Sequence, residues 1–163
     1  MSKPVAFILL VLNLVLYFII TVVASWAINY GIERTHETAS VLSVPARIFP
    51  IYFPIGNMAT GFFVILALLA GVVGMITSLT GLNNVALWNA PNLHAAAASS
   101  LASLSLTVLA MGLACKEIQY GWIDANLRTL ETITIIVSVT QLFSTVVIHA
   151  GVEDAIASHR GHR

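Results

Sequence analysis

The chain has 163 residues, of which 58% are hydrophobic and only 9% are charged, whereas an ordinary soluble domain is about 25% charged. This composition excludes a soluble globular domain. Seven lysines and arginines balance seven aspartates and glutamates, so the net charge provides no basic surface for nucleic acid. We therefore expect the lipid bilayer, and not nucleic acid, to be the partner of the chain.

The positions of the charges divide the chain into apolar segments. Residues 4–32, 48–115 and 132–152 contain no Asp, Glu, Lys or Arg. A spanning helix needs about 20 mainly apolar residues, so the first and last segments each hold one span. The central segment holds two spans, joined by a turn at about 81–92. The sequence predicts an all-α, integral membrane four-helix bundle in one domain, with spans at about 5–30, 56–80, 93–116 and 127–150.

The first apolar segment has a second interpretation as a cleaved signal peptide, because Lys3 precedes it. The apolar run extends to Ile28, which is too long for a signal-peptide core, and this length favours an uncleaved span. Residues 31–55 form a long first loop, and residues 151–163 form a short polar tail. If the spans alternate, three basic residues lie on one side and four on the other, and the basic flank and tail favour cytoplasmic termini.

Small residues recur at spacings of three and four in the second and third predicted spans. Ala70, Gly74 and Ser78 follow this rhythm in the second, and Ser100, Ser103 and Thr107 in the third. Small side chains let membrane helices approach closely. These faces are suited to holding the bundle together, and also to a homo-oligomer or a larger membrane complex.

Polar residues form a stripe along the fourth predicted span, at successive spacings of three, four, three, four and four: Glu131, Thr134, Ser138, Gln141, Thr145 and His149. Such groups are costly against lipid, so the stripe faces the bundle interior, a partner or water. It therefore either lines a path for a solute or bonds the helices together. Thr and Ser can bond to the preceding helical turn. Gln141 thus most needs a partner, and Asn13 in the first span is the predicted one.

Catalytic and metal-binding motifs are not found in the sequence. There is no HExxH, GxSxG or phosphate-binding loop, and Cys115 is the single cysteine. We expect no enzyme activity, no cofactor and no metal. Lys116 and Glu117 form the densest charge pair beside a span, which is typical of a helix end at the headgroups. Lys116 and Arg128 are also candidate contacts for a carboxylate solute at one mouth of the bundle.

Several short runs resemble the AWPM-19-like family of plant plasma-membrane proteins. They occur in order in every predicted span between Leu12 and Gly151, and they include Leu12-Asn-Leu-Val-Leu-Tyr17, Ala24-Ser-Trp-Ala27, Asn57-Met-Ala-Thr-Gly-Phe-Phe-Val64, Ala67-Leu-Leu-Ala-Gly-Val-Val-Gly74, Gly112-Leu-Ala-Cys-Lys-Glu-Ile118, Leu127-Arg-Thr-Leu-Glu131, Thr140-Gln-Leu-Phe143 and His149-Ala-Gly151. The first loop from Ile32 to Pro54 departs from this pattern because it is longer and richer in proline. The resemblance implies four spans and induction by abscisic acid and water stress.

Two functional hypotheses follow from the resemblance and the stripe. The first is a plasma-membrane facilitator of abscisic acid influx that acts in drought, cold and seed dormancy, with Gln141, Ser138 and Asn13 as hydrogen-bonding groups along the path. The second is an accessory tetraspan protein that stabilises the membrane or a larger complex during dehydration. Composition and spacing do not choose between them, because both need a four-span bundle with a polar stripe.

Overall fold

The computed structural model describes residues 3–39, 58–120 and 125–161, and within these residues the chain is all-α. The described helices are α1 (Lys3–Ala39), α2 (Met58–Leu87), α3 (Ala90–Tyr120) and α4 (Ala125–Gly161). Each contains a segment long and apolar enough to cross a bilayer, and these segments are Lys3–Glu33, Ala59–Leu87, Ala90–Gln119 and Ala125–Ala157. The predicted all-α, four-helix membrane fold is confirmed.

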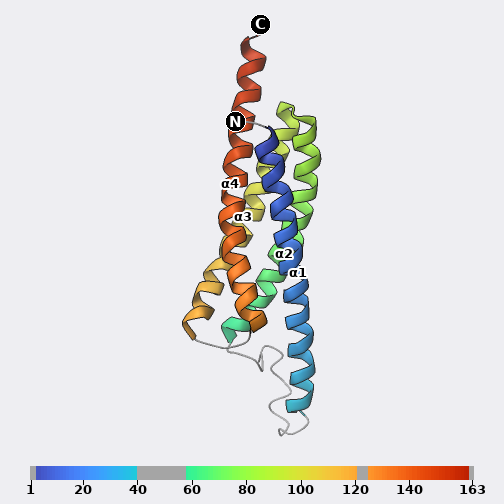
Figure 1. Cartoon of the computed structure of the whole chain (residues 1–163), viewed down its shortest axis with the longest axis vertical. Helices are drawn as coiled ribbons and strands as arrows, with labels where there is room; N and C mark the ends of the chain where they lie inside the picture. The colour runs from blue at the N-terminus through green and yellow to red at the C-terminus, as the bar shows by residue number, and fades with distance from the viewer. Residues whose placement is uncertain (1–2, 40–57, 121–124, 162–163) are drawn as a thin grey trace.

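The helices run alternately up and down the long axis of the molecule (Figure 1). α1 packs against α2, α2 against α3 and α3 against α4, and α4 also packs against α1 and so closes the bundle. α4 extends beyond the other helices at the end where α1 begins (Figure 1). The opposite end, where α3 stops and α4 starts, is called the α3–α4 end below.

All four helices continue past the ends of the predicted spans, and three of them do so by seven residues or more. α1 extends to Ala39 within the predicted loop 31–55, α2 extends to Leu87 through part of the predicted turn 81–92, and α4 extends to Gly161 through most of the predicted tail 151–163. Packing accounts for two of these extensions. Val85 of α2 is fully buried, and Ile156 of α4 packs against the same hydrophobic cluster. Residues 40–57 lie outside the described residues. They include most of the predicted loop and the start of the predicted second span.

The connection between α2 and α3 consists of two residues, Trp88 and Asn89. Trp88 has a φ of 45°, a left-handed conformation that turns the chain sharply. The side chain of Asn89 accepts a hydrogen bond from the backbone N–H of Asn92 at 3.0 Å, which is an N-terminal cap for α3. Asn83 and Asn84, which suggest a turn in the sequence, lie inside α2. The turn is therefore shorter than predicted.

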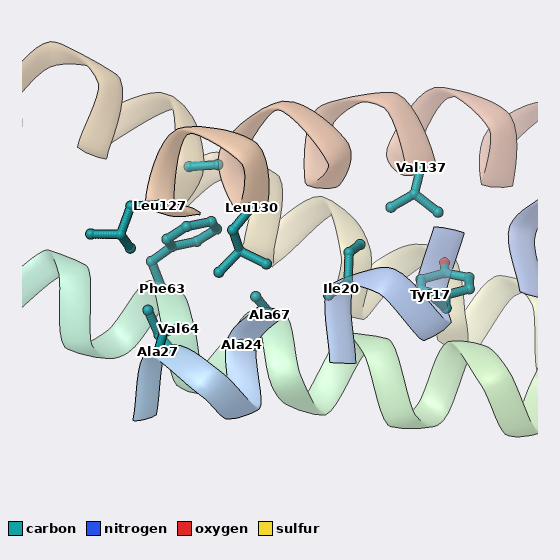
Figure 2. Packing of buried hydrophobic residues seen from close by; sticks show 11 residues of the cluster. Tyr17, Ile20, Ala24, Ala27, Phe63, Val64, Ala67, Leu127, Leu130 and Val137 are labelled. Atoms are coloured by element: carbon teal, nitrogen blue, oxygen red, sulfur yellow. The ribbon is translucent and has the colours of Figure 1, made fainter. Parts of the chain in front are cut away.

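Two hydrophobic clusters fill the bundle interior. The first extends towards the α3–α4 end, and Figure 2 shows Phe63 of α2 close to Leu130 of α4, with Tyr17 of α1 further along. The second lies towards the other end and includes Leu10, Leu93 and Ile148. Outside the bundle, many large apolar side chains are exposed, as expected of a surface in contact with lipid, including Ile8, Phe18, Ile65, Leu109, Phe143 and Val146.

Candidate functional site

A polar layer separates the two hydrophobic clusters, and its members come from three helices. We define it as Asn13 of α1, Ser100 of α3 and Gln141 of α4, and all three side chains are buried. Asn13 Nδ2 donates to Gln141 Oε1 at 2.9 Å, and Gln141 Nε2 donates to the carbonyl oxygen of Ser100 at 3.1 Å. The amide of Gln141 therefore joins α4 to both α1 and α3, and the pair predicted from the sequence is formed.

The predicted stripe on α4 faces the interior along most of its length. Glu131, Thr134, Ser138, Gln141 and Thr145 are buried, whereas His149 is exposed. The hydroxyls of Thr134, Ser138 and Thr145 each donate to the carbonyl oxygen four residues earlier, at 2.7 to 2.9 Å. His149 Nδ1 likewise lies 2.8 Å from the carbonyl oxygen of Thr145. Most of the stripe is thus satisfied by its own helix, as Ser and Thr commonly are.

A second set of cross-helix bonds lies one turn below the polar layer and centres on Tyr17 of α1. Its hydroxyl lies 2.8 Å from Thr107 Oγ1 and 3.2 Å from Ser103 Oγ, both on α3. Thr107 Oγ1 already donates its single proton to the carbonyl oxygen of Ser103, so Tyr17 donates to Thr107. Ser138 Oγ of α4 donates to the backbone carbonyl oxygen of Thr107 at 3.4 Å, so α4 contacts the same turn of α3. The role of Tyr17 is not predictable from the sequence, because one aromatic residue in an apolar run gives no sign of its direction.

Two buried polar atoms at or near the polar layer have no hydrogen-bond partner among the described residues. They are Asn13 Oδ1 and Ser144 Oγ. Asn13 and Ser144 are both fully buried. An unpaired buried acceptor costs about 1–3 kcal/mol, so these atoms are places where a donor from another molecule would be favoured.

The predicted carboxylate contacts lie apart from the layer. Lys116 and Arg128 are exposed at the α3–α4 end, and the structure does not bring them to Asn13 or Gln141. Arg128 lies three residues before Glu131 on α4, so the two are neighbours on the helix surface. Glu117, three residues before the end of α3, is buried and accepts a hydrogen bond from Thr60 Oγ1 at 2.5 Å. Its side chain is buried because α2 packs on the side of α3 that carries Glu117.

The membrane-length helices and the polar groups turned inward define an α-helical tetraspan membrane protein. Residues 11–151 match the AWPM-19-like family. The chain is also 41% identical over 144 residues to "Membrane protein PM19L" of Oryza sativa subsp. japonica, which covers 88% of this chain and 76% of the rice protein. The chain belongs to the AWPM-19-like family. No solved structure matches it.

Proposed function

We propose that the chain facilitates the influx of abscisic acid across the plasma membrane, as part of responses to drought and cold and of seed dormancy. Its membership of the AWPM-19-like family supports this proposal. The structural observation that carries it is the polar layer, in which Asn13 Oδ1 is a buried acceptor with no donor among the described residues. The proposal involves no catalysis, cofactor or metal.

A neutral organic acid fits the hydrogen-bonding pattern of this layer. Its carboxyl O–H supplies the donor that Asn13 Oδ1 lacks, and its carbonyl oxygen accepts from the amide groups of Asn13 or Gln141. The solute then replaces the helix-to-helix bonds that must break when it enters the layer. A neutral acid also avoids the cost of carrying a charge into the bilayer centre. Lys116 and Arg128, exposed at the α3–α4 end, are placed to attract the anion before it takes up a proton.

The test is uptake of labelled abscisic acid into liposomes that contain the purified protein. Gln141→Leu removes both hydrogen bonds made by the side-chain amide, and we expect it to reduce the uptake rate. Thr140→Val is the matched control, because Thr140 lies at the same depth and its hydroxyl donates to Val137 of its own helix. Normal uptake by Gln141→Leu, at equal protein abundance, would remove the polar layer from the transport mechanism.

A second candidate function is that of an accessory tetraspan protein that stabilises the membrane or a larger complex during dehydration. The observation that favours it is the direct bonding of α1, α3 and α4 across the polar layer, at distances that leave no space between the paired groups. The same liposome experiment separates the two candidates. Uptake no faster than in empty vesicles would favour the accessory function, or one that needs a homo-oligomer or a further partner.

We also propose that both termini lie in the cytoplasm, which would place the α3–α4 end outside the cell. Lys3 before the first span and the short basic tail with Arg160 and Arg163 support this orientation. An epitope tag at either terminus should be inaccessible to antibody in intact cells and accessible after permeabilisation. A tag detected in intact cells would reverse the orientation.

A further inference from the structure

The hydroxyl of Ser144 on α4 has no hydrogen-bond partner among the described residues, although the side chain is fully buried. Elsewhere in the spans, the hydroxyls of Ser100, Ser105 and Ser138 donate to carbonyl oxygens three or four residues earlier on their own helices. The hydroxyl of Ser144 does not make this bond. Because an unpaired buried hydroxyl is costly, a polar group of another molecule would be favoured beside it.

Ser144 lies one turn from the polar layer, on the face of α4 that meets α1. Gln141, Ser144 and Ile148 share this face, because they are separated by three and four residues. Gln141 is hydrogen-bonded to Asn13 of α1. One turn further along, Ile148 belongs to the same hydrophobic cluster as Leu10 of α1. Ser144 therefore lies between two contacts of α4 with α1, and its Cβ atom is about 5–6 Å from that of Gln141.

The second unpaired atom of this region is Asn13 Oδ1, in the polar layer itself. An amide oxygen only accepts hydrogen bonds, whereas a serine hydroxyl both donates and accepts. The two atoms do not satisfy each other, since both are unpaired among the described residues. A solute that satisfies both must therefore carry two polar groups, namely an O–H for Asn13 Oδ1 and an oxygen within about one helical turn of it for Ser144.

Both groups of such a solute must be neutral. Residues 4–32, 48–115 and 132–152, which form the four spans at this depth, contain no Asp, Glu, Lys or Arg. An ionised group would find no counter-charge there. A protonated carboxyl group and a hydroxyl group fit the two unpaired atoms without that cost.

We propose that Ser144 selects solutes that carry a hydroxyl group near the carboxyl group, by hydrogen bonding to that hydroxyl while Asn13 binds the carboxyl O–H. This inference rests on the proposed transport of abscisic acid. The ring of abscisic acid carries a hydroxyl group on the carbon from which the chain with the carboxyl group extends. The ketone lies on the far side of the ring, so the hydroxyl group is the one within reach of Ser144.

Uptake of two labelled probes into liposomes that contain the full chain tests this role. The probes are abscisic acid and its deoxy analogue, in which hydrogen replaces the ring hydroxyl group, and uptake by empty vesicles is subtracted. We expect the wild-type chain to take up abscisic acid about two- to tenfold faster than the analogue, as one hydrogen bond allows. Ser144→Ala should slow abscisic acid to the rate of the analogue and leave the analogue unchanged. Ser105→Ala is the matched control and should keep the preference, because the hydroxyl of Ser105 donates to Leu101 of its own helix.

Reversible unfolding in mixed micelles gives a second measurement. Because Ser144 Oγ has no partner to lose among the described residues, Ser144→Ala should be at least as stable as the wild-type chain. Excess abscisic acid should stabilise the wild-type chain more than this variant, since a solute stabilises the folded state according to its affinity.

Several results would overturn the role of Ser144 alone. They are a wild-type chain without the preference, a preference that survives in Ser144→Ala, equal slowing of both probes by that variant, and a variant less stable than the wild-type chain. The last would show that the hydroxyl has a partner within the protein. Uptake of abscisic acid by the wild-type chain no faster than by empty vesicles would overturn the proposed function, and this inference with it.

Discussion

Replacing Gly74 by alanine should destabilise the bundle, because this glycine lies against the ring of Tyr17. A Cβ atom at position 74 would lie 2.4 to 2.5 Å from three ring atoms, which is much shorter than van der Waals contact. The ring is held in place, since it is fully buried and its hydroxyl is bound between Ser103 and Thr107 of α3. The added methyl group therefore forces α1 and α2 apart, or it moves the ring and breaks these bonds.

The size of the effect follows from three contributions. Overpacking in a well-packed core costs about 1–3 kcal/mol. Loss of the two hydrogen bonds of Tyr17 adds about 1 kcal/mol, because such bonds between membrane helices average about 0.6 kcal/mol each. Alanine is favoured over glycine inside a helix by about 1 kcal/mol, which offsets part of this. We expect Gly74→Ala to lower the free energy of unfolding by about 1–3 kcal/mol.

The assay is reversible unfolding in mixed micelles, followed by circular dichroism. Gly112→Ala is the matched control, because Gly112 lies inside α3 and a Cβ there would meet nothing within 4 Å. This control should be as stable as the wild-type chain or up to about 1 kcal/mol more stable. If Gly74→Ala and Gly112→Ala unfold alike, the contact between α1 and α2 is not as close as described.

A double variant gives an independent check of the same contact. Tyr17→Leu removes the ring that the new methyl group would strike, so the penalty of Gly74→Ala should shrink in that background. The loss in the double variant should then be smaller than the sum of the two single losses. Strictly additive losses would contradict a direct clash between positions 17 and 74.

Two further predictions concern bonds at other levels of the bundle and use the same unfolding assay. A double-mutant cycle with Asn13→Leu and Gln141→Leu should give a coupling energy of about 0.6 kcal/mol and at most about 1.7 kcal/mol; zero coupling would mean that the bond does not contribute. Thr60→Val should cost about 1–3 kcal/mol, because it leaves a second oxygen of Glu117 unpaired, while Thr60→Ser should keep most of the stability. Equal stability of the Val and Ser variants would contradict the role of the hydroxyl.

The fold was predictable from the sequence because charge is so costly in a bilayer that its positions mark the span borders. The helix ends were less predictable. Asn83 and Asn84 suggest a turn, yet α2 continues past them to Leu87, since Val85 is buried in the second hydrophobic cluster. The end of a helix depends on what its last turn packs against, and local sequence contains little of that information.

Only one part of the candidate site was predictable from the sequence, namely the polar face of α4. The spacing on α4 identifies one face, and the cost of polar groups in lipid turns that face inward. The partners on other helices depend on how the helices are rotated about their axes. Thr60 and Glu117 lie 57 residues apart in sequence, and only the packing of α2 on α3 brings them together. In the sequence, Glu117 stands next to Lys116 and therefore suggests a charge at the surface. Its burial is a result of the packing of α2 on α3.

The closed polar layer is compatible with a solute path because the bonds that close it are weak. Two hydrogen bonds hold the amide of Gln141, and at about 0.6 kcal/mol each they amount to less than the 1.4 kcal/mol that changes an equilibrium tenfold. Gln141→Leu therefore distinguishes a barrier from a binding site. If the layer only closes the bundle, the variant loosens it and uptake rises; if the layer binds the solute, as we propose, the variant loses those bonds and uptake falls.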